Sequence, residues 1–303
     1  MMESIFVTSN NALANAVSGI RLAEQLLENS AKNIRHSRTE NYARRDLQIK
    51  SVDNLGEGNG AVVTEVIRKI DQSMYNAIIE QISTFEYSKI LDEYNQQIQL
   101  LFGSPGGNTT IDLALEDFFS SIKLLSENPE YNSLRFDTIN KVKNLTDIIS
   151  ELAKNLQKLR YKADGDIKRE FDHVNQQLQN LYSVNAALAR IPGQDNAKAD
   201  LVESRDNIVQ DIAKRININT YYKSNDQVVI NTSNGIPLIS EHLYSINYEK
   251  ITSFESLIGD NIIPETTILS KDGDGEIIDS HVLIPSGMGN NVDSTIKDGS
   301  ILA

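Results

Sequence analysis

The sequence of 303 residues contains no cysteine and no tryptophan, and only six prolines. Without cysteine, the chain can form neither disulfides nor thiolate metal sites. Aromatic residues make up 6% of the chain against 40% hydrophobic residues in all, so its cores must be mainly aliphatic. A chain of this length exceeds one ordinary core, and we therefore expect two or three domains.

Targeting signals are also missing. No apolar run approaches the roughly 18–20 residues that cross a bilayer, and the N-terminus lacks the basic and apolar regions of a cleavable signal peptide. We expect no contact with a membrane. If the protein leaves the cell, it does so by a route that cleaves no signal.

Positive charge is scarce, with 29 Lys and Arg residues against 42 Asp and Glu residues and a formal net charge of -13. This excess of negative charge repels phosphate backbones and argues against nucleic-acid binding. A local exception is the basic cluster of Arg35, Arg38, Arg44 and Arg45. We interpret this cluster as a solvated linker or as a contact with acidic groups of a partner.

The sequence shows no catalytic or metal-binding pattern. The stretch Asp272-Gly273-Asp274-Gly275-Glu276 resembles the start of a calcium loop, but ligands and the structural glycine of that loop are misplaced, which favours a hairpin turn. His36, His173, His242 and His281 have no partners at metal-ligand spacing. No nucleophile elbow or phosphate loop is present. We predict no enzymatic activity, no cofactor and no metal.

The N-terminal segment carries a pronounced apolar stripe. Hydrophobic residues fall seven apart with small residues between them, at Leu13, Ala16, Ile20, Ala23, Leu27 and Ile34. Such a heptad stripe is typical of coiled coils, and a lone helix cannot bury it. We predict a helix from about Ser9 to Arg35 that packs against neighbouring subunits and lacks a fixed structure in the free monomer.

The remaining sequence predicts helices followed by strands. A hairpin is expected within residues 36–69, then helices at about 71–102, 112–128, 130–189 and 199–215. Gly165 interrupts the longest helix at a shift of its apolar register, which predicts a bend or break there. Short strands follow, with turns at Asn225-Asp226 and Asn234-Gly235.

These elements predict a mainly α fold, an elongated helical bundle or coiled coil with a short β-hairpin, followed by a β-rich outer domain. We expect three parts: an N-terminal assembly helix (1–35), a helical bundle core with the hairpin (36–218) and an incomplete β-rich domain (219–303).

A sequence motif follows the N-terminal helix. Asn33-Ile34, Thr39, Asn41-Tyr42 and Arg44 resemble the signature N-N-I-x-N-x-x-T-x-G-Y-x-R of bacterial flagellar axial proteins. Asn41 stands where that signature has Gly, a mild change because Asn tolerates the left-handed backbone conformation that Gly supplies.

Further residues make the resemblance more specific. Asp117-Phe118-Phe119, Asn128-Pro129, the long helix and the Arg205-Asp206 helix follow in this order. Together with the signature, they resemble the hook-associated protein 1 family over residues 4–250.

The resemblance implies a secreted structural subunit that joins the flagellar hook to the filament and has no enzymatic activity. Such proteins are exported unfolded by the flagellar type III apparatus and serve motility. Their partners are copies of themselves, the hook protein and the adjacent junction protein, together with an export chaperone.

In that family a C-terminal helix pairs with the first helix and takes part in chaperone recognition. The sequence stops at Ala303 in the β-rich region, so we expect this chain to lack that part. Two alternatives are another axial protein, such as a hook or filament subunit, and a cytoplasmic coiled-coil scaffold that self-associates through residues 9–35.

Overall fold

The computed structural model describes residues 2–39, 41–54, 57–103, 111–191, 196–250, 262–263, 266–271, 275–284 and 287–288. The chain divides into two compact units, each built from several segments. The first comprises residues 1–82, 176–214 and 218–244, and the second comprises residues 83–175, 215–217 and 245–303. The predicted turn at Asp272-Gly273-Asp274 lies outside the described residues.

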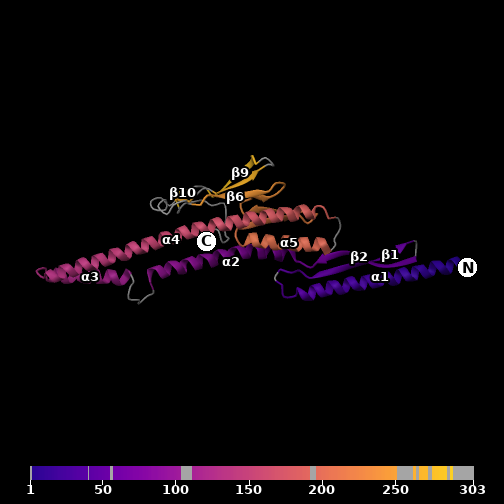
Figure 1. The fold of residues 1–303 in the computed structure, drawn as a ribbon, viewed down its shortest axis with the longest axis horizontal. Coiled ribbons are helices and arrows are strands. Elements are labelled where there is room, and N and C mark those ends of the chain that lie inside the picture. The colour runs from indigo at the N-terminus through magenta and orange to yellow at the C-terminus, as the bar shows by residue number, and fades with distance from the viewer. Residues whose placement is uncertain are drawn as a thin grey trace. The chain divides into compact units, whose positions relative to one another are not determined.

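The first unit begins with a helix lying beside a hairpin. Helix α1 (Met2–Arg35) runs along the antiparallel strands β1 (Arg45–Asn54) and β2 (Glu57–Arg68) (Figure 1). We call α1 and this hairpin the arm. The helix begins at Met2 rather than near Ser9, because no Pro or Gly precedes Ser9 to end it earlier.

Helix α1 is bonded to the hairpin at Ser18. Its Oγ donates to the carbonyl oxygen of Ala61 and accepts from the amide of Ala61, both at 3.0 Å. The neighbouring Gly60 has φ of 94°, and a Cβ placed there would lie 2.2 Å from the Ser18 Oγ. Gly60 is therefore required both by its backbone conformation and by the close approach of the helix.

Helix α2 (Gln72–Phe102) is capped by the residue that precedes it. The Asp71 Oδ1 accepts from the amides of Ser73 at 2.9 Å and Met74 at 3.1 Å, which satisfies two donors of the first turn. Gly103, with φ of 88°, ends the helix in the left-handed conformation.

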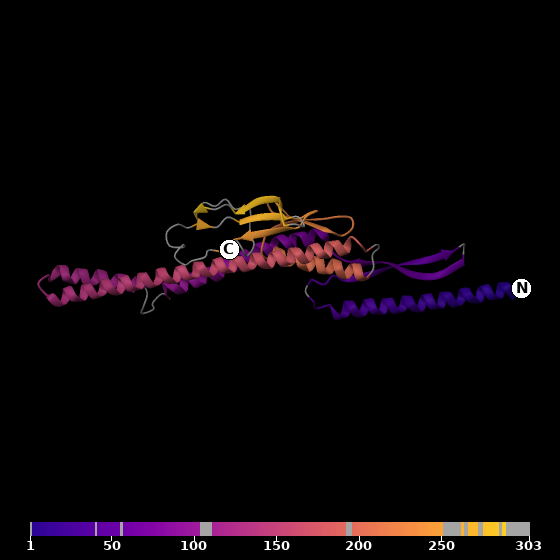
Figure 2. The ribbon, with the colours of Figure 1, turned by 45° about the horizontal axis from the view of Figure 1, so that its top comes forward.

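Helix α3 (Ile111–Glu127) lies beside the first half of α4 (Asn132–Leu188) in both views (Figures 1 and 2). Helix α4 is continuous over 57 residues, so of the bend or break predicted at Gly165 the break is wrong, and the bend stays a prediction. Gly165 is buried, and a Cβ there would lie 3.2 Å from the Nζ of Lys250. The glycine makes room for the lysine side chain rather than ending the helix.

The first unit also contains a small sheet packed near α5 (Asn196–Ala213). Its strands are β3 (Ile218–Tyr222), β4 (Val228–Thr232) and β5 (Pro237–Ile239), in the order β3-β4-β5. Both connecting turns fall where predicted, with positive φ at Asp226 and Gly235.

The second unit has a sheet of β6 (Tyr244–Tyr248), β8 (Thr266–Lys271) and β9 (Ile277–Ile284), in the order β6-β8-β9. Strands β7 (Ile262–Ile263) and β10 (Gly287–Met288) pair with each other. The predicted fold class is thus confirmed: long helices dominate, and small antiparallel sheets occupy the C-terminal part.

Candidate functional site

The apolar stripe of α1 is exposed in the structure. Leu13 is 63% exposed, Ile20 60%, Leu27 70% and Ile34 75%. Ala16 and Ala23, the small residues of the stripe, are exposed as well. These six side chains therefore form an apolar surface on a single helix with the heptad spacing of a coiled-coil seam.

The opposite face of α1 binds the hairpin. Ser18, Asn29 and Asn33 lie roughly half a turn around the helix from the stripe, and each bonds to the hairpin backbone. The expectation that residues 1–35 lack a fixed structure in the monomer is therefore not met. Polar residues give α1 an intramolecular partner, while the stripe remains uncovered.

The signature residues form the turn that joins α1 to β1. Asn33 donates its Nδ2 to the carbonyl of Arg45 at 2.9 Å, and its Oδ1 accepts from the Arg45 amide at 3.0 Å and the Tyr42 hydroxyl at 2.9 Å. Asn41 has φ of 64°, the left-handed conformation that the Gly of the signature supplies and that Asn tolerates. Three signature positions, Asn33, Asn41 and Tyr42, thus cooperate in one turn.

The other signature residues have different surroundings. Thr39 contacts the ring nitrogen Nδ1 of His36 at 3.3 Å, and the His36 ring stacks on Tyr42 with centroids 5.0 Å apart. Arg44 is exposed and pairs with Asp46 at 3.2 Å. Ile34 belongs to the exposed stripe.

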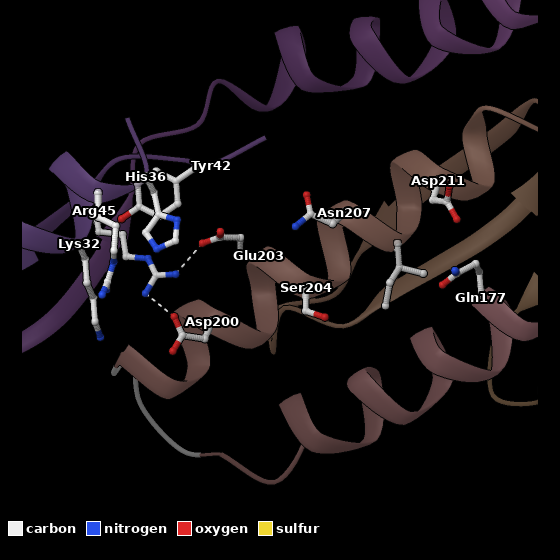
Figure 3. A pocket seen from close by; sticks show the side chains of 12 residues that line it. Lys32, His36, Tyr42, Arg45, Gln177, Asp200, Glu203, Ser204, Asn207 and Asp211 are labelled. Carbon is white, nitrogen blue, oxygen red and sulfur yellow. Dashed lines mark hydrogen bonds and ion pairs between the residues drawn. The ribbon is translucent and has the colours of Figure 1, made fainter. Parts of the chain in front are cut away.

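Of the two interpretations of the basic cluster, a solvated linker or a contact with a partner's acids, Arg45 follows neither fully, because it contacts acids of its own chain. Its side chain is 4% exposed, and its guanidinium donates to Asp200 at 2.5 Å and to Glu203 at 2.6 Å, both on α5 (Figure 3). Burial by itself lowers the pKa of Arg45, but the hydrogen bonds and charges of Glu203 and Asp200 outweigh burial, and the pKa is raised. Sequence reasoning missed these partners, although acids three residues apart on one helix were an available signal.

A pocket of about 630 Å³ lies beside this contact. Lys32 and His36 of α1 and its turn line one side, and Glu203, Asn207 and Asp211 follow one face of α5 on the other (Figure 3). Most of the residues that line it have polar or charged side chains, and their charges are of both signs.

A second arginine of the hairpin is bonded to α5 nearby. Arg68 donates to Asp206 at 2.6 Å, and Arg205 also bonds to the Asp206 carboxylate. The hydroxyl of Tyr75 donates to the Asp206 carbonyl at 3.0 Å. Burial, reinforced by the charge of Asp206, raises the pKa of the Tyr75 hydroxyl, so this group stays neutral.

Two searches within the described residues gave no further kind of site. No group of three or more His, Asp or Glu side chains there could hold a metal ion. None of the described helices combines the length and the apolar character that a membrane span requires.

Comparison with known families gave a match over residues 95–287, to the flagellar hook-associated protein FlgK helical domain. The chain belongs to the FlgK family. This membership confirms the resemblance that the sequence motifs indicated, to a family of flagellar hook-associated proteins.

The fold agrees with that family. The flagellar hook junction protein FlgK from Burkholderia pseudomallei has a similar structure, with a TM-score of 0.55 and 18% identity, over 76% of this chain. This chain spans 38% of the length of that FlgK protein. A comparison with curated protein sequences found no match.

Proposed function

We propose that this FlgK-family chain is a subunit of the hook–filament junction and that α1 packs by its apolar stripe against helices of neighbouring subunits. The observation that supports the proposal is the division of α1 into two faces. Its polar face is bonded to the hairpin through Ser18 and Asn33, whereas Ile20 and Leu27 on the other face are exposed. An exposed seam with heptad spacing is suited to another helix.

The proposal includes the partners and the route. Copies of the same chain, the hook protein and the adjacent junction protein would contact the stripe, after unfolded export through the flagellar type III apparatus. An export chaperone is a further partner if the residues that it recognises are present. No catalytic step enters this function, because the work of the subunit is mechanical.

The location is tested by immunogold electron microscopy with an antibody raised against residues 219–303. The proposal predicts a single gold cluster where the filament meets the hook. Label along the filament or along the hook would contradict the junction role and indicate another axial subunit. Label confined to the cytoplasm would indicate a scaffold and overturn the proposal.

The stripe is tested by the double substitution Ile20→Asp with Leu27→Asp. Because both side chains are exposed in the monomer, its melting temperature should change by no more than about 2 °C, whereas label at the junction should disappear. Circular dichroism gives the first result and microscopy the second.

A control changes net charge equally on the same helix. Ala14→Asp with Arg21→Ala also removes two charge units, and both residues are exposed outside the stripe. This variant should keep the junction label. If it loses the label as well, charge rather than the stripe is responsible; if the stripe variant fails to fold, the stripe is internal core.

A further inference from the structure

Two arginines stand directly opposite each other at the base of the hairpin. Arg45 of β1 is the register partner of Arg68 of β2. Directly opposite residues of an antiparallel pair share one face, where like charges repel. The side chains are nevertheless buried, at 4% and 8% exposure, so this position requires compensating negative charge.

Helix α5 supplies that charge at regular spacing. Asp200, Glu203 and Asp206 recur every three residues, so they follow one side of the helix. Arg45 bonds to the first two and Arg68 to the third. The two opposed arginines therefore hold three successive acids of α5, a set that we call the clamp.

Apolar packing at this contact is limited. Among the described residues 41–51 and 60–70, the buried ones are Ala43, Arg45 and Val66. Two small apolar side chains bury little surface, so the ion pairs are the most specific attachment of the hairpin base to α5.

Some hydrogen-bond donors of the clamp also lack partners within the described part of the chain. The Nε of Arg45 and both Nε and Nη2 of Arg68 are buried and find no hydrogen-bond partner among the described residues. Buried donors without partners oppose the gain from the ion pairs. The clamp therefore specifies an orientation more than it contributes stability, which suits a contact that can be opened.

We propose that Arg45 and Arg68 are positioning residues that fix the orientation of the arm on α5, and that breaking the clamp releases the arm as one body while the rest of the first unit stays folded. The arm stays together because Ser18 and Asn33 hold α1 to the hairpin independently of α5. The clamp acts within a single chain, so it goes beyond the proposed function and does not depend on subunit packing.

The test uses two spin labels in the monomer. Because the chain has no cysteine, Ser30→Cys on the arm and Ser183→Cys on α4 provide the only two thiols, and both positions are exposed. Pulsed dipolar spectroscopy then reports the distribution of distances between them. The unmodified clamp should give one narrow distribution.

Arg45→Glu should broaden or shift this distribution, because it places a carboxylate next to those of Asp200 and Glu203, and the three negative charges repel one another. Combining Arg45→Glu with Glu203→Arg restores an ion pair with the charges exchanged and should narrow the distribution again. Lys69→Glu is a control of equal charge change at an exposed neighbour, and it should leave the distribution unchanged. A general loss of stability would not be reversed by the exchange.

Failure of folding is covered by a gentler variant. If Arg45→Glu does not fold by circular dichroism, Asp200→Asn with Glu203→Gln removes the acids without introducing repulsion and should release the arm. An unchanged distribution in the folded variants would overturn the proposal, and so would a charge exchange that folds but does not restore it. Neither result involves the junction, so the proposed function is tested separately.

Discussion

Asn33, Asn175 and Asn185 each hold both backbone groups of one distant residue. Asn175 donates to the carbonyl of Ile246 at 2.8 Å and accepts from its amide at 2.7 Å, and Asn185 bonds Val228 in the same way, at 2.8 and 3.0 Å. A side-chain amide thus takes the place of a neighbouring strand residue. These residues fasten helices to strands by hydrogen bonds, in addition to the apolar packing around them.

Asn185→Ala should lower the free energy of unfolding by about 2 kcal/mol, because it leaves the buried backbone groups of Val228 without their partner. Urea unfolding followed by circular dichroism measures this loss. Asn180→Ala on the same helix is the control, since Asn180 is exposed and bonds only within α4. An equal loss in both variants would contradict this role of Asn185.

Gly60→Ala should destabilise the arm more than Gly235→Ala does. Both glycines have positive φ, which costs an Ala roughly 1 kcal/mol. The Cβ at Gly60 would also collide with the Ser18 side chain, whereas that at Gly235 meets nothing within 4 Å. The difference between the two melting temperatures therefore measures the collision, and equal values would show that α1 does not approach Gly60 closely.

Among the elements, α4 has two unequal halves. Between residues 132 and 160 no described side chain is buried. Farther along, Phe171, Val174, Leu178 and Leu181 are completely buried. The same helix is therefore at most half-buried over its first half, beside α3, and carries completely buried side chains over its second.

We expect amides at 132–160 to exchange with solvent at least about tenfold faster than amides at 171–188, because local opening of the first half exposes little apolar surface. Hydrogen–deuterium exchange with mass spectrometry tests this directly. Equal protection along α4 would contradict the expectation and would mean that the first half is stabilised by contacts other than buried side chains.

At the scale of the whole molecule, a half-buried and a buried tyrosine predict sensitivity to alkali. Burial, together with hydrogen bonds to Asp166 and Asp164, raises the pKa of Tyr94 and of Tyr248. A raised pKa in the folded state means that stability is complete below the unfolded value of about 10 and falls as the pH rises above it.

The urea midpoint should therefore be steady between about pH 8 and 9.5 and decline above pH 10. Tyr94→Phe with Tyr248→Phe should make that decline shallower, because neither ring can then ionise. Lysines also lose charge in this pH range. The contribution of the tyrosines is therefore judged from the difference between the two slopes, with and without the Phe substitutions, and not from the decline alone. An unchanged slope would show that the tyrosines do not contribute.

The sequence predicted most helices and strands because their signals are local. The turns at Asn225-Asp226 and Asn234-Gly235, for example, each depend on neighbouring residues only. The sequence did not reveal the role of Gly165, because the glycine makes room for Lys250, which lies far along the chain. It also did not reveal the ion pairs of Arg45, because their acids lie on α5. The division into parts 1–35, 36–218 and 219–303 stays a prediction.

The paired hydrogen bonds of Asn175 and Asn185 have a consequence for the order in which the chain folds. Their partners Ile246 and Val228 lie 71 and 43 residues later in the chain. In a chain delivered from its N-terminus, all residues of α4, both asparagines included, therefore emerge before either strand. Each strand can then pair in the correct register with one asparagine of α4. This shortens the slow formation of long-range contacts.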